Sequence, residues 1–519
     1  MALPDLLGCL LRDTAFSKVA FAAAVGLATY LLAVVLYGLL LHPLRRYPGP
    51  MYARFTRIPF WIASLRGDSH TFIQALHEKH GPVVRYSPSA ISYTEAQAWR
   101  DICGYEKSRR ENPKTSWFQL PAYNGVPSIF AIPDSGEHAR VRRVFSPAFS
   151  ERSLKQQEAL FQRYVDLLLS KIRQQCHQAG GGGGRVEMVR MLNYMAFDIM
   201  AELCFGEPLG LLDKMEYSQW VASVFGAVKM LPFLQICEYY PLLGHLVHKL
   251  EPRWARKMRD THFRHSADRV DSRLADGSDK PDIWNLLLSE DGKQHRLTLD
   301  EMHSNSETFM MAGTETTATL MSGLLYYLLV NPDKYALLCT EIRTSFTSSD
   351  DITMERLAGL KYLNACIQEG LRIYPPISVG VPRTIPTGGN AVMGQWLPAG
   401  TDVSVHQMAA YHSLANFKHP SHFVPERWLG DVEYTNDRRD VHQPFSFGPR
   451  NCIGMSFAWH EMRLAVGKLI FNFDFELCDE SRDWTRQKVF VLWEKDPLYV
   501  RVKPFVSERE NIRETVPNT

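Results

Sequence analysis

The longest uninterrupted hydrophobic stretch of the chain lies near its N-terminus. Residues 19–41 run for 23 positions without a charged side chain. As a helix this stretch measures roughly 34 Å at about 1.5 Å per residue, which is enough to cross a bilayer. A buried core helix and a cleavable signal peptide are the alternatives. The stretch is apolar on all sides and longer than the apolar region of a signal peptide, so it predicts one transmembrane helix.

Basic residues flank this stretch unevenly. Two precede it (Arg12 and Lys18), and four follow it closely (Arg45, Arg46, Arg54 and Arg57). Because positive charge favours the cytoplasmic side of a membrane, residues 1–18 are predicted to be a short lumenal segment and the bulk of the chain to be cytoplasmic. Residues 42–50 end in Tyr47-Pro48-Gly49-Pro50, a stiff hinge that cannot continue the helix. The catalytic portion is expected over 51–505, with a polar tail at 506–519.

Beyond the hinge the pattern is mainly helical, with a smaller β portion. Thr298 and Glu301 have the spacing of a capping box, apolar residues then recur at helical spacing to Val330, and Asn331-Pro332 is a stop signal. These features predict one long helix of about 31 residues. Short strands are predicted at 83–86 and 401–405, where β-forming residues are flanked by Gly and Pro.

Composition narrows the class of protein. Lysine and arginine number 58 against 56 acidic residues, a net charge of +2, so no overall field favours nucleic acid. Nine cysteines are scattered without paired spacing, which argues against a disulfide framework. The chain also has no Asn-x-Ser/Thr acceptor with a permitted middle residue. Together these observations predict a catalytic portion that faces a reducing compartment.

One window carries the clearest chemistry: Phe445, Gly448, Arg450, Cys452 and Gly454. A cysteine that binds a metal must be a thiolate, and the helix predicted after it would place the sulfur at a positive dipole end. The two glycines are expected to supply backbone freedom and room for a flat cofactor, and the phenylalanine an apolar wall. The arginine can meet a cofactor carboxylate. The alternative is a buried structural cysteine beside a glycine turn.

A second motif lies on the predicted long helix, at residues 312–317. Gly313 shares a helix face with Thr316 and Thr317, and glycine there would let a flat or diatomic group approach the backbone. Glu315 and Thr316 form an acid–alcohol pair that can hold water and pass protons. The alternative is helix packing through small residues, and the hexapeptide alone favours neither reading.

A third pattern, Glu369-x-x-Arg372, recurs at other places in the chain, so its spacing alone is weak. Its context singles it out, because Tyr374-Pro375-Pro376 ends the helix and Arg427 follows before the cysteine window. The three charged residues are predicted to form a buried structural network that positions the cysteine loop.

The cysteine window resembles the haem-binding loop of the cytochrome P-450 superfamily, and residues 312–317 are similar to its oxygen-activation motif. The resemblance spans about Tyr47 to Pro504 and is closest to fungal microsomal members of secondary metabolism. It implies the cytochrome P-450 fold, with haem b between the long central I helix and the L helix after Cys452. Cys452 would be the axial ligand of the iron. Arg450, Arg142, Arg383 and His138 would contact the haem propionates, although many relatives have Trp in place of His138.

The resemblance also implies a function. It predicts a single-pass monooxygenase of the endoplasmic reticulum membrane that takes electrons from NADPH through NADPH-cytochrome P-450 reductase, with cytochrome b5 as an optional second partner. The expected substrate is a lipophilic secondary metabolite such as a terpenoid or polyketide. The alternatives are a haem-thiolate isomerase or dehydratase without a reductase, and a non-catalytic haem binder. The pair Glu315–Thr316 favours the monooxygenase, because the alternatives need no proton delivery to oxygen.

Substrate contacts are expected in three places. Two are the aromatic-rich stretches Trp117–Ile132 and Tyr217–Leu250, and the third is the segment after Pro376, with Ser378 and Val379. Phe309 on the long helix is expected to narrow the pocket with them. A mostly apolar lining suits a lipophilic molecule.

Overall fold

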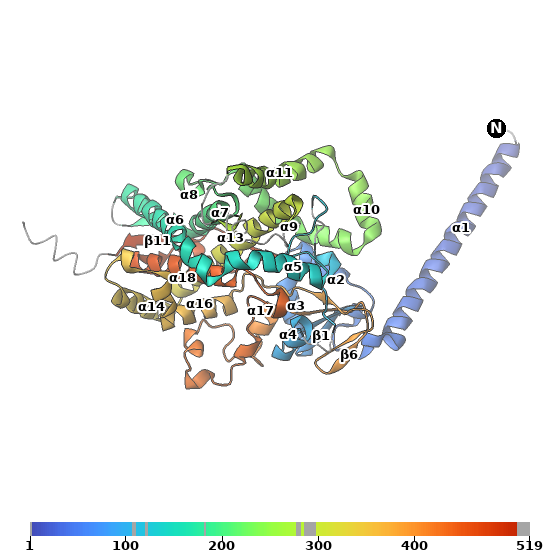
Figure 1. Ribbon diagram of the computed structural model, residues 1–519. Helices are drawn as coiled ribbons and strands as arrows, with labels where there is room; N and C mark the ends of the chain where they lie inside the picture. Colours follow the sequence, from blue (N-terminus) through green and yellow to red (C-terminus); the bar gives the residue numbers. More distant parts are fainter. Residues whose placement is uncertain are drawn as a thin grey trace, which may run out of the picture.

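The computed structural model describes residues 3–105, 110–119, 123–180, 183–276, 282–284 and 297–505. Helix α1 (Leu3–Leu36) continues into a π-helical turn, η1 (Tyr37–Leu41), and stands away from the rest of the molecule (Figure 1). Lys18–Leu41 has a mean hydropathy of 2.4 and is a candidate membrane span with none of its most apolar window buried. The helix starts at Leu3, so the separate segment predicted before residue 19 is part of α1. The tail predicted at 506–519 lies outside the described residues.

The body that follows is mostly helical. Its helices are α2 (Ile58–Leu65), α3 (Ser69–His80), α4 (Ala96–Cys103), α5 (Ser135–Phe145), α6 (Glu151–Gln178), α7 (Met188–Phe205), α8 (Leu211–Lys214), α9 (Gln219–Tyr239), α10 (Pro241–Leu250), α11 (Arg253–Asp276), α13 (Leu299–Leu329), α14 (Pro332–Ser345), α15 (Met354–Ala358), α16 (Lys361–Ile373), α17 (Gln407–Tyr411) and α18 (Met455–Asn472). Helix α9 is also apolar enough to span a membrane by composition, but it is partly buried in the fold and contains Pro232.

The long helix is α13, and its start confirms the capping prediction. Thr298 accepts a hydrogen bond from the backbone N–H of Glu301, and the Glu301 side chain accepts one from the N–H of Thr298. The helix ends at Leu329, and Pro332 begins α14. Residues of α6, α7, α13, α16 and α18 supply much of the largest hydrophobic cluster. Figure 1 shows α13 in the middle of this bundle.

The strands form small sheets at the edges of the helical body. A four-stranded sheet has the order β1 (Val83–Ser87), β2 (Ala90–Tyr93), β7 (Asp402–Val405), β4 (Arg383–Thr384), with β2 and β7 parallel. A three-stranded sheet has the order β3 (Gly184–Glu187), β11 (Tyr499–Pro504), β8 (Phe473–Leu477). Two hairpins pair β5 (Asn390–Val392) with β6 (Gln395–Leu397) and β9 (Lys488–Phe490) with β10 (Leu492–Glu494). The two strands predicted from the sequence, β1 and β7, are confirmed.

This arrangement brings distant motifs together. Helix α18 packs against α13 and α16, so the cysteine loop before α18 lies in the same part of the molecule as residues 312–317. The loop runs through a short 3₁₀ turn, η10 (Gly448–Arg450), before α18 begins at Met455.

Candidate active site

The cysteine loop is held by its own backbone. The N–H of Cys452 donates to the carbonyl of Phe445 at 2.9 Å, which closes the loop. Gly448 has φ of +78°, and an added Cβ would lie 2.0 Å from the carbonyl oxygen of Cys103, so this position requires glycine. Gly454 has φ of −87° and makes no such demand, so the predicted backbone freedom is wrong there. What Gly454 provides is space, because the nearest atom to an added Cβ, on Phe149, is 4.0 Å away.

Cys452 differs from the other cysteines of the chain. Its side chain is exposed, whereas Cys478 is partly covered and six others are buried: Cys103, Cys176, Cys204, Cys237, Cys339 and Cys366. Burial by the surrounding atoms nevertheless raises the pKa of the thiol, while the backbone N–H of Gly454 and the charge of Arg142 lower it. The exposed side chain and the raised pKa are compatible if the protein surrounds the thiol on most sides and leaves one side uncovered. A sulfur in this position, just before α18, is suited to bind a metal as the thiolate.

Cations gather around this loop from four separate segments; three of them are buried and Arg142 is half-buried. They are Arg142 on α5, Arg383 on β4, Arg450 in η10 and Lys114, with the neighbouring carboxylate of Glu111. Arg142 donates to the carbonyl and to the side-chain oxygen of Asn451, both at 2.7 Å, and so braces the residue before Cys452. Lys114 donates to the carbonyl of Phe130 at 2.7 Å.

Arg450 and Arg383 converge on the same carboxylate. Arg450 pairs with Glu111 and donates to the carbonyls of Ile132 and Pro133. Arg383 lies 3.8 Å from Glu111, and its buried Nε has no partner among the described residues. Lys114 and Glu111 are not among the residues predicted for the site. Both come from a stretch without regular structure, so no local pattern marks them.

The charges in this cluster affect one another. Burial, followed by the charges of Arg383 and Arg450, holds the pKa of Lys114 well below its ordinary value. Burial and the neighbouring cations lower the pKa of His138 to about 4. His138 is therefore neutral near pH 7 and adds no charge, so it can offer a cofactor only a neutral hydrogen bond. The predicted interaction with a propionate is then weaker at His138 than at the three arginines.

The turn of α13 at residues 312–317 presents two different faces. Ala312 is exposed and Thr316 is half-buried, and Thr316 Oγ1 donates to the carbonyl of Ala312 at 2.7 Å. Gly313 faces α7, where an added Cβ would lie 2.6 Å from the sulfur of Met200. The expectation that Gly313 admits a flat group is therefore wrong, since its missing side chain makes room for a neighbouring helix. Ala312 and Thr316 form the open part of the turn.

Glu315 also points away from the open face. Its carboxylate pairs with Lys495 at 2.7 Å, and both side chains are only 3% exposed. Lys495 additionally donates to the hydroxyl of Thr319 at 2.8 Å. The second oxygen of Glu315, Oε1, is buried and has no partner among the described residues. No local pattern indicates Lys495 as the partner, because it is 180 residues away from Glu315 along the chain.

We expect Lys495→Met to destabilise the protein by about 3 kcal/mol, because it leaves a buried carboxylate without its partner. Urea unfolding of the full chain would show a lower midpoint with an unchanged slope. In the double variant Lys495→Met/Glu315→Gln the unpaired charge is gone, and most of the lost stability should return. Single-variant effects that simply add in the double variant would show that the two side chains are not coupled.

Comparison with known proteins decides the family. The cytochrome P450 family model matches residues 48–502. This chain belongs to the cytochrome P450 family. The cytochrome P450 monooxygenase efuB of Hormonema carpetanum is 43% identical over 92% of this chain and 95% of its own length. FUM2 of Gibberella moniliformis is 43% identical over 90% of this chain and 99% of its own length. The averantin hydroxylase of Dothistroma septosporum is 38% identical over 94% and 92%.

These relatives confirm the resemblance to fungal monooxygenases and the cytochrome P450 fold. The family implies haem, which carries an iron and two propionate carboxylates. The residues present fit both parts. Cys452 leaves its thiol uncovered just before α18, and the cations around it outnumber the carboxylate of Glu111. An additional pair of negative charges would offset most of this excess.

The predicted structural network of this cytochrome P450 is fully buried. Glu369 accepts two hydrogen bonds from Arg372, at 2.7 and 2.9 Å, and one from Arg427 at 3.2 Å. All three side chains have no exposed area. Glu369 also accepts from the backbone of Val424 and the indole of Trp428, both at 2.9 Å. The network therefore joins α16 to the segment leading to the cysteine loop, as predicted.

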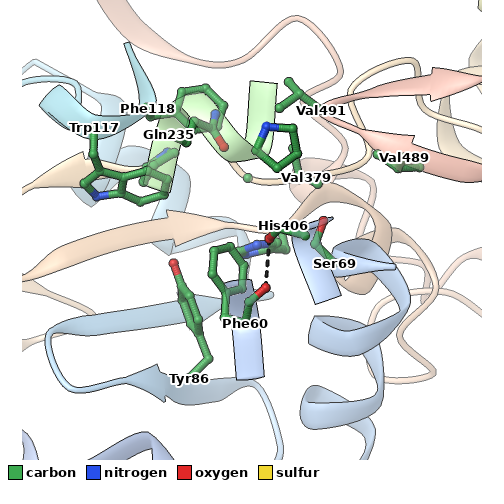
Figure 2. A pocket seen from close by; sticks show the side chains of 14 residues that line it. Phe60, Ser69, Tyr86, Trp117, Phe118, Gln235, Val379, His406, Val489 and Val491 are labelled. Carbon is green, nitrogen blue, oxygen red and sulfur yellow. Dashed lines mark hydrogen bonds between the residues drawn. The ribbon is translucent and has the colours of Figure 1, made fainter. Parts of the chain in front are cut away.

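A pocket brings the predicted substrate segments together (Figure 2). It is lined by Trp117 and Phe118, by Pro232 and Gln235 of α9, and by Val379 and Gly380 after α16, among others. Phe309 does not belong to this lining. Its ring packs edge-on against Phe145 and Phe149, and the expectation that it narrows the space near the iron stays a prediction.

Proposed function

We propose that this cytochrome P450 is a membrane-anchored monooxygenase that oxidises a lipophilic small molecule, with electrons from NADPH delivered by a flavoprotein reductase. The observation that carries the proposal is the pairing of the uncovered thiol of Cys452 with the open, hydroxyl-bearing turn at Ala312 and Thr316. An isomerase or a haem carrier needs the first feature but has no use for the second.

Each group of side chains has a separate role in the proposed reaction. Bound haem supplies the redox chemistry that activates oxygen, with electron density from the thiolate favouring cleavage of the oxygen–oxygen bond. Cys452 Sγ holds the iron, and Arg142, Arg383, Arg450 and Lys114 hold the propionates by charge-assisted hydrogen bonds. Glu369, Arg372 and Arg427 fix the segment that carries the cysteine loop. Phe445 closes that loop through its carbonyl and shields it with its ring.

Thr316 is the proton-handling group in this proposal. Its hydroxyl proton is used in the bond to the carbonyl of Ala312, so its oxygen lone pairs remain free to accept a hydrogen bond from water on the open face. A water held there can donate a proton to the dioxygen substrate. Glu315 lies on the buried side of the same turn, paired with Lys495, and its unpartnered Oε1 can accept a hydrogen bond from a water that connects it to Thr316.

We expect Thr316→Ala to uncouple the reaction. Product formed per NADPH consumed should fall about tenfold, with peroxide released in its place, while haem content stays unchanged. The matched control is Thr314→Ala on the same turn. Its hydroxyl is buried and bonded to the carbonyl of Met310, so this variant should stay coupled. Equal coupling in the two variants would remove Thr316 from the proton path.

The proposed location follows from α1 and the charges beside it. The apolar helix ends near Arg45 and Arg46, which favours a cytoplasmic catalytic portion on an endoplasmic reticulum membrane. NADPH-cytochrome P450 reductase is the proposed electron donor, and cytochrome b5 an optional second one. The name of the averantin hydroxylase specifies a hydroxylation. We extend that reaction type to this chain, with a terpenoid or polyketide secondary metabolite as substrate.

The test is reconstitution of the full haem-loaded chain with reductase in lipid. A panel of apolar polyketides and terpenoids would be supplied under isotopically labelled dioxygen. A monooxygenase inserts one labelled oxygen atom into product and requires NADPH. Turnover without NADPH would favour an isomerase or dehydratase. A thiolate-type carbon monoxide spectrum without turnover of any panel member would favour a non-catalytic haem binder.

A further inference from the structure

The pocket between α2, α3, α9 and the four-stranded sheet has an unusual lining. Its cavity volume is about 30 Å³, which is room for one small polar group, and its walls are mostly aromatic and aliphatic. Among the described residues that line it, none is Asp, Glu, Lys or Arg. Its polar side chains are neutral: they include Ser69, Gln235 and His406, and each of these three is at least nine-tenths buried. Figure 2 shows His406 and Gln235 among the lining side chains.

His406 ends a chain of hydrogen bonds that crosses the sheet. His77 Nδ1 lies 2.9 Å from the carbonyl oxygen of Gly81, and His77 Nε2 lies 2.6 Å from Ser92 Oγ. Ser92 Oγ in turn lies 3.0 Å from His406 Nδ1. Ser404 Oγ is also near that nitrogen, at 3.3 Å, and a hydroxyl can accept as well as donate.

The carbonyl at one end fixes the direction of the whole chain. A carbonyl only accepts, so His77 must carry its proton on Nδ1, and its Nε2 must accept. Ser92 therefore donates its hydroxyl proton to His77, and its oxygen can only accept from His406 Nδ1. Burial lowers the pKa of His77 to about 4 and that of His406 to about 3, so each ring carries one proton near pH 7. The proton of His406 is on Nδ1.

His406 Nε2 is consequently a bare acceptor. It makes no hydrogen bond to the described residues, and it is not among their fully enclosed polar atoms. Its other nitrogen is directed at the sheet, so Nε2 is the polar atom that the ring offers to the pocket. An acceptor in an apolar pocket is costly to leave unpaired once a ligand has displaced water.

We infer that this pocket takes the hydroxyl or N–H end of an uncharged, otherwise apolar molecule, and that His406 Nε2 accepts its proton. The inference rests on the proposed function, because that molecule is the substrate. A carboxylate is disfavoured, since it has no proton to donate to Nε2, and the cation that packs against the lining ring of Trp117, Arg57, already pairs with Asp402. An ether of the same shape would leave Nε2 unpaired. The amide of Gln235 and the hydroxyl of Ser69 can bond the oxygen of the same group.

The test measures binding, not turnover. The haem-loaded full chain would be dialysed to equilibrium against radiolabelled dodecanol, dodecyl methyl ether or dodecanoate. We expect dodecanol to bind about tenfold more tightly than the ether, and dodecanoate to bind more weakly than both. In His406→Phe, dodecanol and dodecyl methyl ether should bind with about equal affinity. The control is His177→Phe, the same change at an exposed position on α6, which should keep the preference for dodecanol.

Ser92→Ala gives a second test that leaves the pocket lining intact. It removes the acceptor that holds the proton on His406 Nδ1. The ratio of the affinities for dodecanol and for its methyl ether should therefore become smaller. Equal affinity for alcohol and ether in the unaltered protein, or an unchanged ratio in both variants, would overturn the inference. Absence of NADPH-dependent oxidation would count against the proposed function alone, because the binding ratio does not depend on turnover.

Discussion

Replacing Cys452 with serine is expected to abolish the thiolate spectrum and the oxidation reaction together. The hydroxyl is close in size to the thiol, so the loop and α18 should stay folded. A neutral hydroxyl cannot supply the electron density that a thiolate gives to iron. Oxidation should fall by at least about a thousandfold, or roughly 4 kcal/mol in the barrier. The reduced protein with carbon monoxide should show no thiolate-type Soret band.

The control for this variant is Cys478→Ser. Cys478 is also not buried, and it directly follows β8, 26 residues beyond Cys452 in the sequence. That substitution should change neither the spectrum nor the rate. Haem content of the Cys452→Ser protein would be measured by pyridine extraction, so that loss of the thiolate is distinguished from loss of haem. A thiolate-type band that persists in Cys452→Ser would show that another residue ligates the iron.

The parts of this fold that could be predicted from the sequence are those determined by residues close together in the chain. Helix α13 could be bounded because its capping box and the proline after it act within a few residues. Strands β1 and β7 were predicted from β-forming runs between Gly and Pro. The cysteine loop was recognisable because its five marked residues, Phe445 to Gly454, fall within ten positions of the sequence. None of these features requires knowledge of the tertiary structure.

The parts that were missed or wrong depend on contacts between distant segments. Glu315 was expected to face water, but its direction is set by Lys495, 180 residues further along. Gly313 is predicted to admit a flat group and Gly454 to supply backbone freedom, whereas the first makes room for Met200 of α7 and the second has an ordinary φ. A motif identifies which residues matter more reliably than it identifies what each one touches.

The buried network of Glu369, Arg372 and Arg427 combines features predicted from the sequence with contacts found only in the structure. The spacing of Glu369 and Arg372 predicted a pair on one face of α16, and Arg427 was added from its position before the cysteine loop. The structure adds Asp437, which pairs with Arg427 and gives the network two acids and two bases. Burial raises the pKa of Glu369, but Arg372 and Arg427 outweigh it and hold the pKa below its usual range. Glu369 is therefore ionised, and its charge is needed for balance.

We expect Glu369→Gln to prevent accumulation of the haem-loaded protein. The change keeps the shape of the side chain but leaves two buried guanidinium groups facing one carboxylate. Uncompensated charge of this kind costs about 3–5 kcal/mol, which is a large part of the total stability of a typical domain. Recovered holoprotein should fall more than about tenfold. Any protein that is recovered should unfold at a clearly lower urea concentration.

The control is Glu355→Gln, which removes a carboxylate from an exposed pair. Glu355 lies 3.5 Å from Lys155, and both side chains are more than 70% exposed, so solvent screens their attraction. This substitution should cost less than about 1 kcal/mol and leave the yield unchanged. Equal yield and equal unfolding midpoints for the two variants would mean that the charge of Glu369 is not needed to hold the cysteine loop. Its role would then be limited to hydrogen bonds that glutamine can also make.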